Sequence, residues 1–482
     1  MKKITFIITL LVIAIVSANA AKLQRYVTVN GAGSKNGTSW ANAATDITLV
    51  MNDLTFDDNY VVTDGGDVFV AAGTYNAPEN GFRMIDKINV YGGFPAAGGS
   101  VRDWKTNKTI LDGKANNTRL ILQGENSPAF TDYCVWDGFI LQNGKAGNGA
   151  GALLTLKGVL SNCIIRNCDA TNGYAIGGAV QSKKNTTAGA AVTGATLYNC
   201  LLINNISGKA TVNFNTAPAY MIYTTVANNK TTGICGIGSP LVATDITATG
   251  MACAGVVLDN WAHWSIGFNN IIWGNEGQTT AQLVSQNGGI KVFHSSVIEG
   301  KGLAIDAAKV TTRDSIITDP IFVRPTSFKG LAVTTEQLAE LEAADFHVQS
   351  TSPCIGKAKV EDSNFGAGKV FNLIPSVDLA GNARVGADGK ADMGAYQTGG
   401  TTGFTKINEI QFRVSIIDQL CLINGLQHND KIKIYSINGK QLYAGTSAVE
   451  TMFIDATHFG KGILLVSVER GGDSYSQKVM NK

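Results

Sequence analysis

Six short segments of the chain superimpose without gaps, and this repeat limits the possible folds more than any other feature of the sequence. Their starts are 25, 37, 24, 46 and 25 residues apart. We interpret these intervals as a step of about 24 residues, with an insertion inside the 37-residue interval and two steps inside the 46-residue interval. Such a period is typical of a solenoid, whereas β-propeller blades need about 40 residues or more. The segments are Asp137 to Asn143, Asn162 to Cys168, Asn199 to Asn205, Tyr223 to Asn229, Asn269 to Asn275 and His294 to Gly300.

The columns of this alignment alternate as a β-strand does. The second column holds small or short residues and the fourth only aliphatic ones, and alternate strand positions face the same side. Stacked turns would bury an aliphatic column that no single repeat can bury alone. The seventh column is mostly Asn, and we expect it to form left-handed corners whose amides hydrogen-bond from turn to turn. The fourth column is Ile140, Ile165, Leu202, Val226, Ile272 and Val297, and the seventh is Asn143, Cys168, Asn205, Asn229, Asn275 and Gly300.

Other elements flank the repeat. Residues 45–54 space their apolar side chains helically after Thr45 as a possible N-cap, and such a helix would plug the open first turn of a solenoid. Residues 336–344 form a second helical patch in an irregular return segment. Residues 398–403 have the composition of a flexible linker, and the short strand patterns after them predict a small antiparallel β-sandwich over residues 404–482.

The first 20 residues have the pattern of a signal peptide. Lys2 and Lys3 precede an apolar run from Ile4 to Val16, and Ala18-Asn19-Ala20 fits a cleavage site. At about 13 residues the run is short for a membrane span, which needs about 20. We therefore expect export, loss of residues 1–20, and no transmembrane segment in the mature chain.

Composition excludes several classes of function. The net charge is +2 and only 16% of residues are charged, so no basic excess exists for nucleic acid. Eight cysteines are too few for a disulfide scaffold, and their spacing fits no zinc site. We therefore expect no metal, no cofactor and no nucleic-acid partner.

Several motifs resemble those of a known family. Residues 66–75 (GDVFVAAGTY), 91–94 (YGGF), 109–113 (TILDG) and 137–139 (DGF) resemble the N-terminal half of bacterial pectin-lyase-like right-handed β-helix proteins. Residues 378–384 (DLAGNAR) and 392–396 (DMGAY) resemble the closing segment of the choice-of-anchor Q group within that family. The resemblance covers residues 25 to 397 and implies a right-handed parallel β-helix. The family holds lyases, hydrolases and adhesins, so its fold does not define a function.

The C-terminal residues resemble a second family. The segment KIKIYSINGKQLY from Lys431 to Tyr443, with Phe459-Gly460-Lys461-Gly462 and Lys478-Val479, is similar to the C-terminal sorting domains of type IX secretion in Bacteroidetes-type bacteria. Such domains usually open with Asn-Pro, whereas residues 404–482 contain no proline. The resemblance implies recognition by secretion machinery and display at the cell surface or outside the cell, associated with the outer membrane.

The catalytic patterns of the resembling enzymes are missing. Neither Gly-His-Gly nor Arg-x-Lys occurs, and the charged residues of the repeat columns, Asp137, Arg166 and Glu299, each occupy a different column. Asp137 precedes Gly138 and is interpreted as a turn residue. Catalytic candidates would have to come from the insertions between repeats, and they are Asp169, Lys183, Lys184, Asp245 and Asp259.

Aromatic and sulfur-bearing residues supply two further hypotheses. Trp261, Trp264, Trp273 and Phe139 could stack on sugar rings, or could pack under inserted loops. Cys163 and Cys200 share the second repeat column, so we expect them to lie close together inside the coil. A disulfide is possible there, but buried thiols are favoured.

The sequence therefore predicts an all-β protein with four parts: a signal peptide (1–20), a right-handed parallel β-helix (21–397), a linker (398–403) and a β-sandwich (404–482). Because no two charged residues share a column, we predict a non-catalytic surface protein of the adhesin type that binds or presents to glycans or other surface polymers. The alternative is a polysaccharide lyase or glycoside hydrolase acting on acidic polysaccharide. Only the lyase alternative would call for Ca²⁺.

Overall fold

The computed structural model describes most of the chain from Leu23 to Asn481. The described residues are 23–54, 65–114, 116–123, 130, 133–155, 157–172, 176–183, 195–215, 219–232, 255–259, 265–277, 282–285, 291–300, 302–304, 310–312, 314–360, 363–364, 370–371, 375–386, 388–398, 412–417, 419–470 and 473–481. The predicted signal peptide and most of the predicted linker lie outside them. No helix in these ranges has the length and apolar character needed to cross a membrane.

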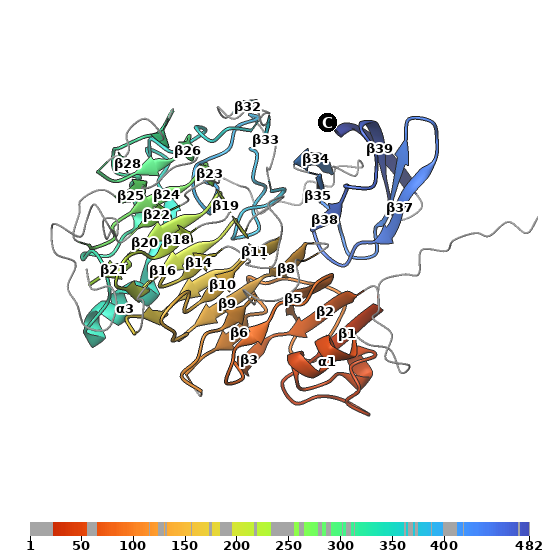
Figure 1. Cartoon of the computed structure of the whole chain (residues 1–482), viewed down its shortest axis with the longest axis horizontal. Coiled ribbons are helices and arrows are strands. Elements are labelled where there is room, and N and C mark those ends of the chain that lie inside the picture. Colours follow the sequence, from red (N-terminus) through yellow and green to blue (C-terminus); the bar gives the residue numbers. More distant parts are fainter. Residues whose placement is uncertain are drawn as a thin grey trace, which may run out of the picture.

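Three parallel sheets form the larger part of the protein, and each turn of the chain adds one strand to a sheet (Figure 1). The predicted fold class, a parallel β-helix followed by a β-sandwich, is confirmed. The first sheet holds β1 (Leu23–Val27), β2 (Gly66–Ala71), β5 (Ile88–Phe94), β8 (Cys134–Asp137), β11 (Gly158–Ser161), β15 (Ala195–Tyr198), β19 (Ala219–Ile222), β23 (Ser265–Phe268), β26 (Lys291–His294) and β29 (Val310–Thr311).

The second and third sheets have eight strands each in the described part of the chain. The second sheet holds β3 (Gly73–Asn76), β6 (Thr109–Asp112), β9 (Phe139–Gln142), β12 (Ile164–Arg166), β16 (Leu201–Ile203), β20 (Thr225–Ala227), β24 (Ile271–Trp273) and β27 (Val297–Ile298). The third holds β4 (Phe82–Arg83), β7 (Ile121–Leu122), β10 (Ala152–Leu154), β14 (Val180–Ser182), β18 (Val212–Asn215), β22 (Val256–Asp259), β25 (Leu283–Ser285) and β28 (Gly302–Ala304). A small sheet of β13 (Asp169–Ala170), β17 (Ile206–Ser207) and β21 (Lys230–Thr231) follows one corner.

The strand register confirms the repeat but corrects two details of its alignment. β20 pairs directly with β24, so the 46-residue interval is one turn with an insertion and not two turns. The first and last segments are also shifted by one residue. Ile140 lies opposite Ile164, where the alignment had placed it opposite Ile165, and Ile272 lies opposite Ile298.

Most left-handed corners lie in columns one and six of the alignment; column seven, where they were predicted, supplies Asn143 and Gly300, at φ 59° and 71°. Asn162 and Asn199 in column one, and Asn167 and Asn204 in column six, have φ between 51° and 56°. Asn accepts this left-handed backbone more readily than most residues do. The other three asparagines of column seven turn inward instead, and their amides stack.

That inward amide stack confirms the expected hydrogen bonds from turn to turn. Asn205 Nδ2 donates to Asn229 Oδ1 at 2.9 Å, and Asn229 Nδ2 donates to Asn275 Oδ1 at 2.8 Å. The three side chains are at most 3% exposed. The ladder thus satisfies the hydrogen-bonding groups of the buried backbone at these corners.

The interior of the coil is filled by inward side chains of all three sheets. The predicted aliphatic column contributes Ile165, Leu202, Val226 and Ile272, each with 0% exposure. Cys163 and Cys200 lie on neighbouring turns as free, fully buried thiols, as favoured from the sequence, and burial raises the pKa of Cys163 well above its usual range.

Helix α1 (Ile47–Asp53) closes the first turn, as predicted. Its side chains Ile47, Val50 and Met51 join the interior cluster. The N-cap is Asp46, not Thr45, because the Asp46 carboxylate accepts from the Thr48 and Leu49 amides. A short 3₁₀ turn, η1 (Trp40–Asn42), precedes the helix.

The described part of a return segment (residues 314–398) packs on the outer face of the second sheet from β12 to β27. It contains β30 (Phe322–Arg324), α3 (Thr335–Ala343), β31 (Asp345–Val348), β32 (Ser363–Asn364) and β33 (Val370–Phe371). Direct contacts fix it to the coil: the Ala332 amide donates to Asn204 Oδ1 at 2.8 Å, and the Ala395 amide donates to Thr225 Oγ1 at 3.0 Å.

Two antiparallel sheets form the predicted C-terminal sandwich. One is β34 (Arg413–Ile417), β35 (Leu420–Asn424) and β38 (Thr451–Asp455), and the other is β37 (Gln441–Thr446), β36 (Lys431–Ser436), β39 (Gly462–Arg470) and β40 (Asp473–Asn481). Their facing side chains, including Ile432, Val466 and Ile423, form a core of their own.

The sandwich packs against the outer face of the first sheet near β2, β5 and β8 (Figure 1). Ala448 and Val449 join a cluster with Phe69 and Tyr91 of the coil. Lys157 Nζ of the coil lies 3.7 Å from Asp455 Oδ2 of the sandwich. This interface is apolar apart from a few charged groups, and Glu450 is one of them.

Docking of the sandwich should weaken as the pH rises. Burial raises the pKa of Glu450, with Arg102 opposing and Asp137 adding to the rise, and one Glu450 oxygen is buried without a partner among the described residues. A carboxyl with a raised pKa stabilises the docked state at low pH, and this contribution is lost as the pH rises through that pKa. We expect the melting temperature to fall by about 2–4 °C between pH 5 and pH 8.

The variant E450Q should lose that pH dependence, because its amide stays neutral. The matched control is E469Q, since Glu469 lies on β39 of the four-stranded sheet and contacts Lys431 Nζ at 3.5 Å. Thermal unfolding at constant ionic strength measures both. An unchanged pH slope in E450Q would contradict the assignment.

Candidate functional site

A groove runs between the second sheet and the return segment. It consists of two adjoining cavities of about 240 and 360 Å³, which share the side chains of Ile164, His347 and Tyr396. We call this feature the return-segment groove. Ligand sites are commonly concave and apolar with a few polar groups, and this groove has that character.

The floor of the groove is the outer face of the second sheet. In β12 the side chain of Ile165 points into the core, so its neighbours Ile164 and Arg166 point outward. Ile164 lies in register with Ile140 and Leu201 of the adjacent turns. The parallel strands therefore give the groove an apolar floor.

The opposite wall carries a histidine held in one orientation. His347 Nδ1 lies 2.6 Å from Asp345 Oδ1, and the imidazole stacks on the Tyr396 ring at 4.1 Å with an angle of 26° between planes. The His347 and Asp345 side chains are 33% and 35% exposed. Because Nδ1 is engaged by Asp345, Nε2 is the nitrogen that a ligand can reach.

Cationic side chains outnumber acidic ones around the groove. Lys105 and Lys108 line the smaller cavity, and Arg166 and Arg324 line the larger one, against the carboxylates of Glu342 and Asp345. Burial lowers the pKa of Lys108, so its ammonium gains from an anionic partner. The excess of positive charge favours anionic ligands.

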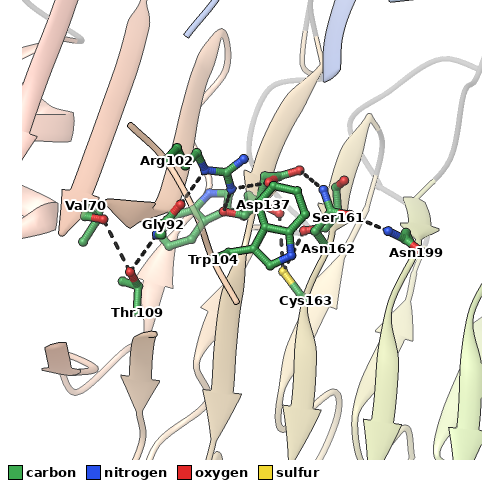
Figure 2. Close-up of polar contacts among 12 residues, drawn as sticks. Val70, Gly92, Arg102, Trp104, Thr109, Asp137, Ser161, Asn162, Cys163 and Asn199 are labelled. Atoms are coloured by element: carbon green, nitrogen blue, oxygen red, sulfur yellow. Dashed lines mark hydrogen bonds and ion pairs between the residues drawn. The ribbon is translucent and has the colours of Figure 1, made fainter. Parts of the chain in front are cut away.

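A chain of buried polar contacts runs next to the groove, and one of its members, Asn162, lines the smaller cavity (Figure 2). Arg102 pairs with Asp137, Asn162 Nδ2 donates to Asp137 Oδ2 at 2.9 Å, and Asn199 Nδ2 donates to Asn162 Oδ1 at 2.6 Å. Arg384 of the return segment donates to Asn199 at the other end. This chain follows the corner between the first and second sheets and ties the return segment to it.

Trp104 connects the same two parts. Its indole Nε1 donates to the Leu379 carbonyl at 3.1 Å, 275 residues later in the chain. Both residues line the smaller cavity. The groove is thus bounded by chain from opposite ends of the β-helix.

Asp137 is not a simple turn residue, which corrects the sequence interpretation. Its side chain is buried and pairs with Arg102, while the turn that follows is made by Gly138 at φ 77°.

His294, at the end of β26, is buried with 2% exposure.

Two of the catalytic candidates from the insertions, Asp169 and Lys183, are described with their side chains, and neither lines the groove. Asp169 contacts Lys145 at 3.8 Å and the Thr171 amide, and Lys183 follows β14 of the third sheet. The backbone of Asp259 lies at the end of β22, also in the third sheet. Lys184 and Asp245 lie outside the described residues.

The aromatic candidates have different environments. Phe139 lines the smaller cavity, but it is 1% exposed and packs on Trp136, so its face is not open to a sugar ring. Trp273 is half-buried against the cluster under the return segment. Trp261 and Trp264 lie outside the described ranges.

Sequence reasoning named Phe139 but missed most of the other residues that meet in the groove. Lys105, Lys108, His347 and Tyr396 all lie outside the repeat columns, and only the DMGAY motif, which contains Tyr396, marked one of them. Within the described ranges, no three His, Cys, Asp or Glu side chains gather in a way that could hold a metal ion.

Comparison of the chain with protein-family models, with curated proteins and with solved structures found no match. Function is therefore inferred from the groove itself.

Proposed function

We propose that this protein binds acidic polysaccharide in the return-segment groove without cleaving it. The observation that carries the proposal is the combination, in one groove, of cationic side chains with the stacked rings of His347 and Tyr396. Sugar rings pack on aromatic faces through apolar contact, and their carboxylates pair with Lys and Arg. A long solenoid also adds many weak contacts along a polymer.

The cellular setting belongs to the same proposal. The signal-like residues 1–20 support export, and the motifs of residues 66–139 and 378–396 support membership of the pectin-lyase-like choice-of-anchor Q group. The sandwich, through its resemblance to type IX sorting domains, supports contact with secretion machinery and display at the cell surface. An adhesin-like role in holding or presenting to surface glycans follows from such display.

A polysaccharide lyase or glycoside hydrolase is the second candidate, because one observation favours the lyase. With Nδ1 held by Asp345, Nε2 of His347 has the arrangement of a general base. In a lyase it would take the proton next to a sugar carboxylate, and the C–H electrons would form a double bond. The glycosidic C–O bond would break with its electron pair going to the departing oxygen, which would take a proton from water. Arg166 or Lys108 would neutralise the carboxylate, a task for which other lyases use Ca²⁺.

Binding should depend on the lysines of the smaller cavity. The double variant K105Q/K108Q removes two charges from the wall, so we expect about a fivefold loss of affinity for an oligogalacturonate and no change for a neutral glucan. Calorimetry on residues 21–482 measures both. The control K431Q/K433Q removes two charges from β36 of the sandwich, where both lysines contact Glu469.

The same samples separate the two candidate functions. Binding without new unsaturated chain ends, read by ultraviolet absorbance, is the result expected. Absence of any binding to acidic chains would refute the proposal. Release of unsaturated ends that disappears in H347A would make the lyase the better assignment.

A further inference from the structure

Arg166 is held in place on the floor of the groove by polar contacts across three turns. Its Nε and Nη2 donate to Gln142 Oε1 at 3.1 and 2.9 Å. Gln142 Nε2 in turn donates to Asp112 Oδ2 at 2.8 Å. These residues occupy equivalent positions on β6, β9 and β12. The guanidinium is therefore oriented before any ligand arrives.

The remaining edge of this guanidinium meets a carboxylate of the protein itself. Arg166 Nη1 donates to both oxygens of Glu342, at 3.2 and 3.3 Å. The Glu342 side chain is 63% exposed and the Arg166 side chain 25% exposed, and both line the larger cavity. An ion pair this exposed contributes little stability, so another anion can displace it.

Helix α3 does not need this ion pair to stay in place. Its first turn is fixed by a capping box, in which Thr334 and Gln337 satisfy each other's backbone amides. Its apolar side chain Leu341 is buried in the cluster under the return segment. Glu342 can therefore release Arg166 without loss of the helix.

We infer that Glu342 stands in for the carboxylate of a uronic acid and competes with it for Arg166. The inference rests on the proposed function and names its ligand class, a carboxylated sugar. A uronate presents the same planar carboxylate that Glu342 presents, and guanidinium groups favour that geometry. Glu342 is thus a built-in competitor that lowers the affinity of the groove for acidic chains.

The test uses E342Q in the full mature chain, residues 21–482, with an oligogalacturonate as the probe. Removing the competing charge should raise affinity about two- to fivefold, the range that an exposed ion pair implies. R166Q should weaken binding several-fold, and R166Q/E342Q should bind no better than R166Q, since the competitor then has nothing to block. Each variant is checked for an unchanged melting temperature.

A matched control lies on the same helix. Glu340 accepts hydrogen bonds from Ser327 instead of Arg166, so E340Q should bind like the wild type while removing the same charge. A sulfated oligosaccharide of equal length serves as the second probe, and we expect a smaller gain for it.

The outcomes distinguish the competitor role of Glu342 from the proposed polysaccharide binding on which it rests. Wild-type binding with no gain, or a loss, in E342Q would overturn the competitor role and leave the proposed function in place. An equal gain in E340Q would assign the effect to net charge and would also overturn it. Absence of binding in wild type and in all variants would overturn both.

Discussion

Replacing Arg384 with methionine is expected to lower the free energy of unfolding by about 3–5 kcal/mol and to detach the end of the return segment. The guanidinium is fully buried and donates to the carbonyls of Gly394 and Ala395, at 3.1 and 2.8 Å, and to Asn199. It also lies 4.4 Å from the centre of the Tyr223 ring.

The loss of stability is large because the oxygen atoms that accept from Arg384 remain buried after the substitution. Each buried acceptor left without a donor costs about 1–3 kcal/mol, and methionine replaces only the apolar volume. Urea unfolding measures the change, and limited proteolysis locates the freed segment. R324M serves as the control, since Arg324 is exposed on β30. A loss below about 1 kcal/mol in R384M would show that the return segment is held by other contacts.

Replacing Asn229 with alanine should cost about 3 kcal/mol. Its Nδ2 donates to Asn275 Oδ1 and to the carbonyls of Leu202 and Ala227, at 2.8, 3.0 and 2.9 Å. Its Oδ1 accepts from the amide and side chain of Asn205, both at 2.9 Å. Alanine leaves these partners buried and unpaired in the middle of the ladder.

Chemical denaturation of N229A compared with N52A measures this cost. Asn52 is exposed on α1, so its replacement should change stability by less than about 0.5 kcal/mol. Similar losses in the two variants would mean that the ladder does not stabilise the coil.

The sequence predicted the coil well because its signal is local and periodic. Ile165, Leu202, Val226 and Ile272 repeat at fixed positions, and the structure places all four in the core. The register of the outer segments failed because Gly138 and Ser295 make the left-handed corner one position later in the alignment. An insertion and an extra turn also look alike when only length is known, which explains the wrong interpretation of the 46-residue interval.

The groove could not be predicted, because non-repetitive segments complete it. His347 and Tyr396 belong to the return segment, while Ile164 lies on the repeat about half the chain earlier, so no local spacing links them. Asp137 illustrates the same limit. The dipeptide Asp-Gly is typical of a turn, and the partner that gives Asp137 its role, Arg102, is 35 residues away.

The hydrogen bond from Trp104 to Leu379 has a mechanical consequence. A solenoid with free ends can unravel one turn at a time from either end, because each turn contacts only its neighbours. Here the return segment is fastened to the loop between β5 and β6, so tension applied to the return segment reaches an early turn of the coil directly. Under force, many turns of the coil then share the load and unfold cooperatively instead of one after another.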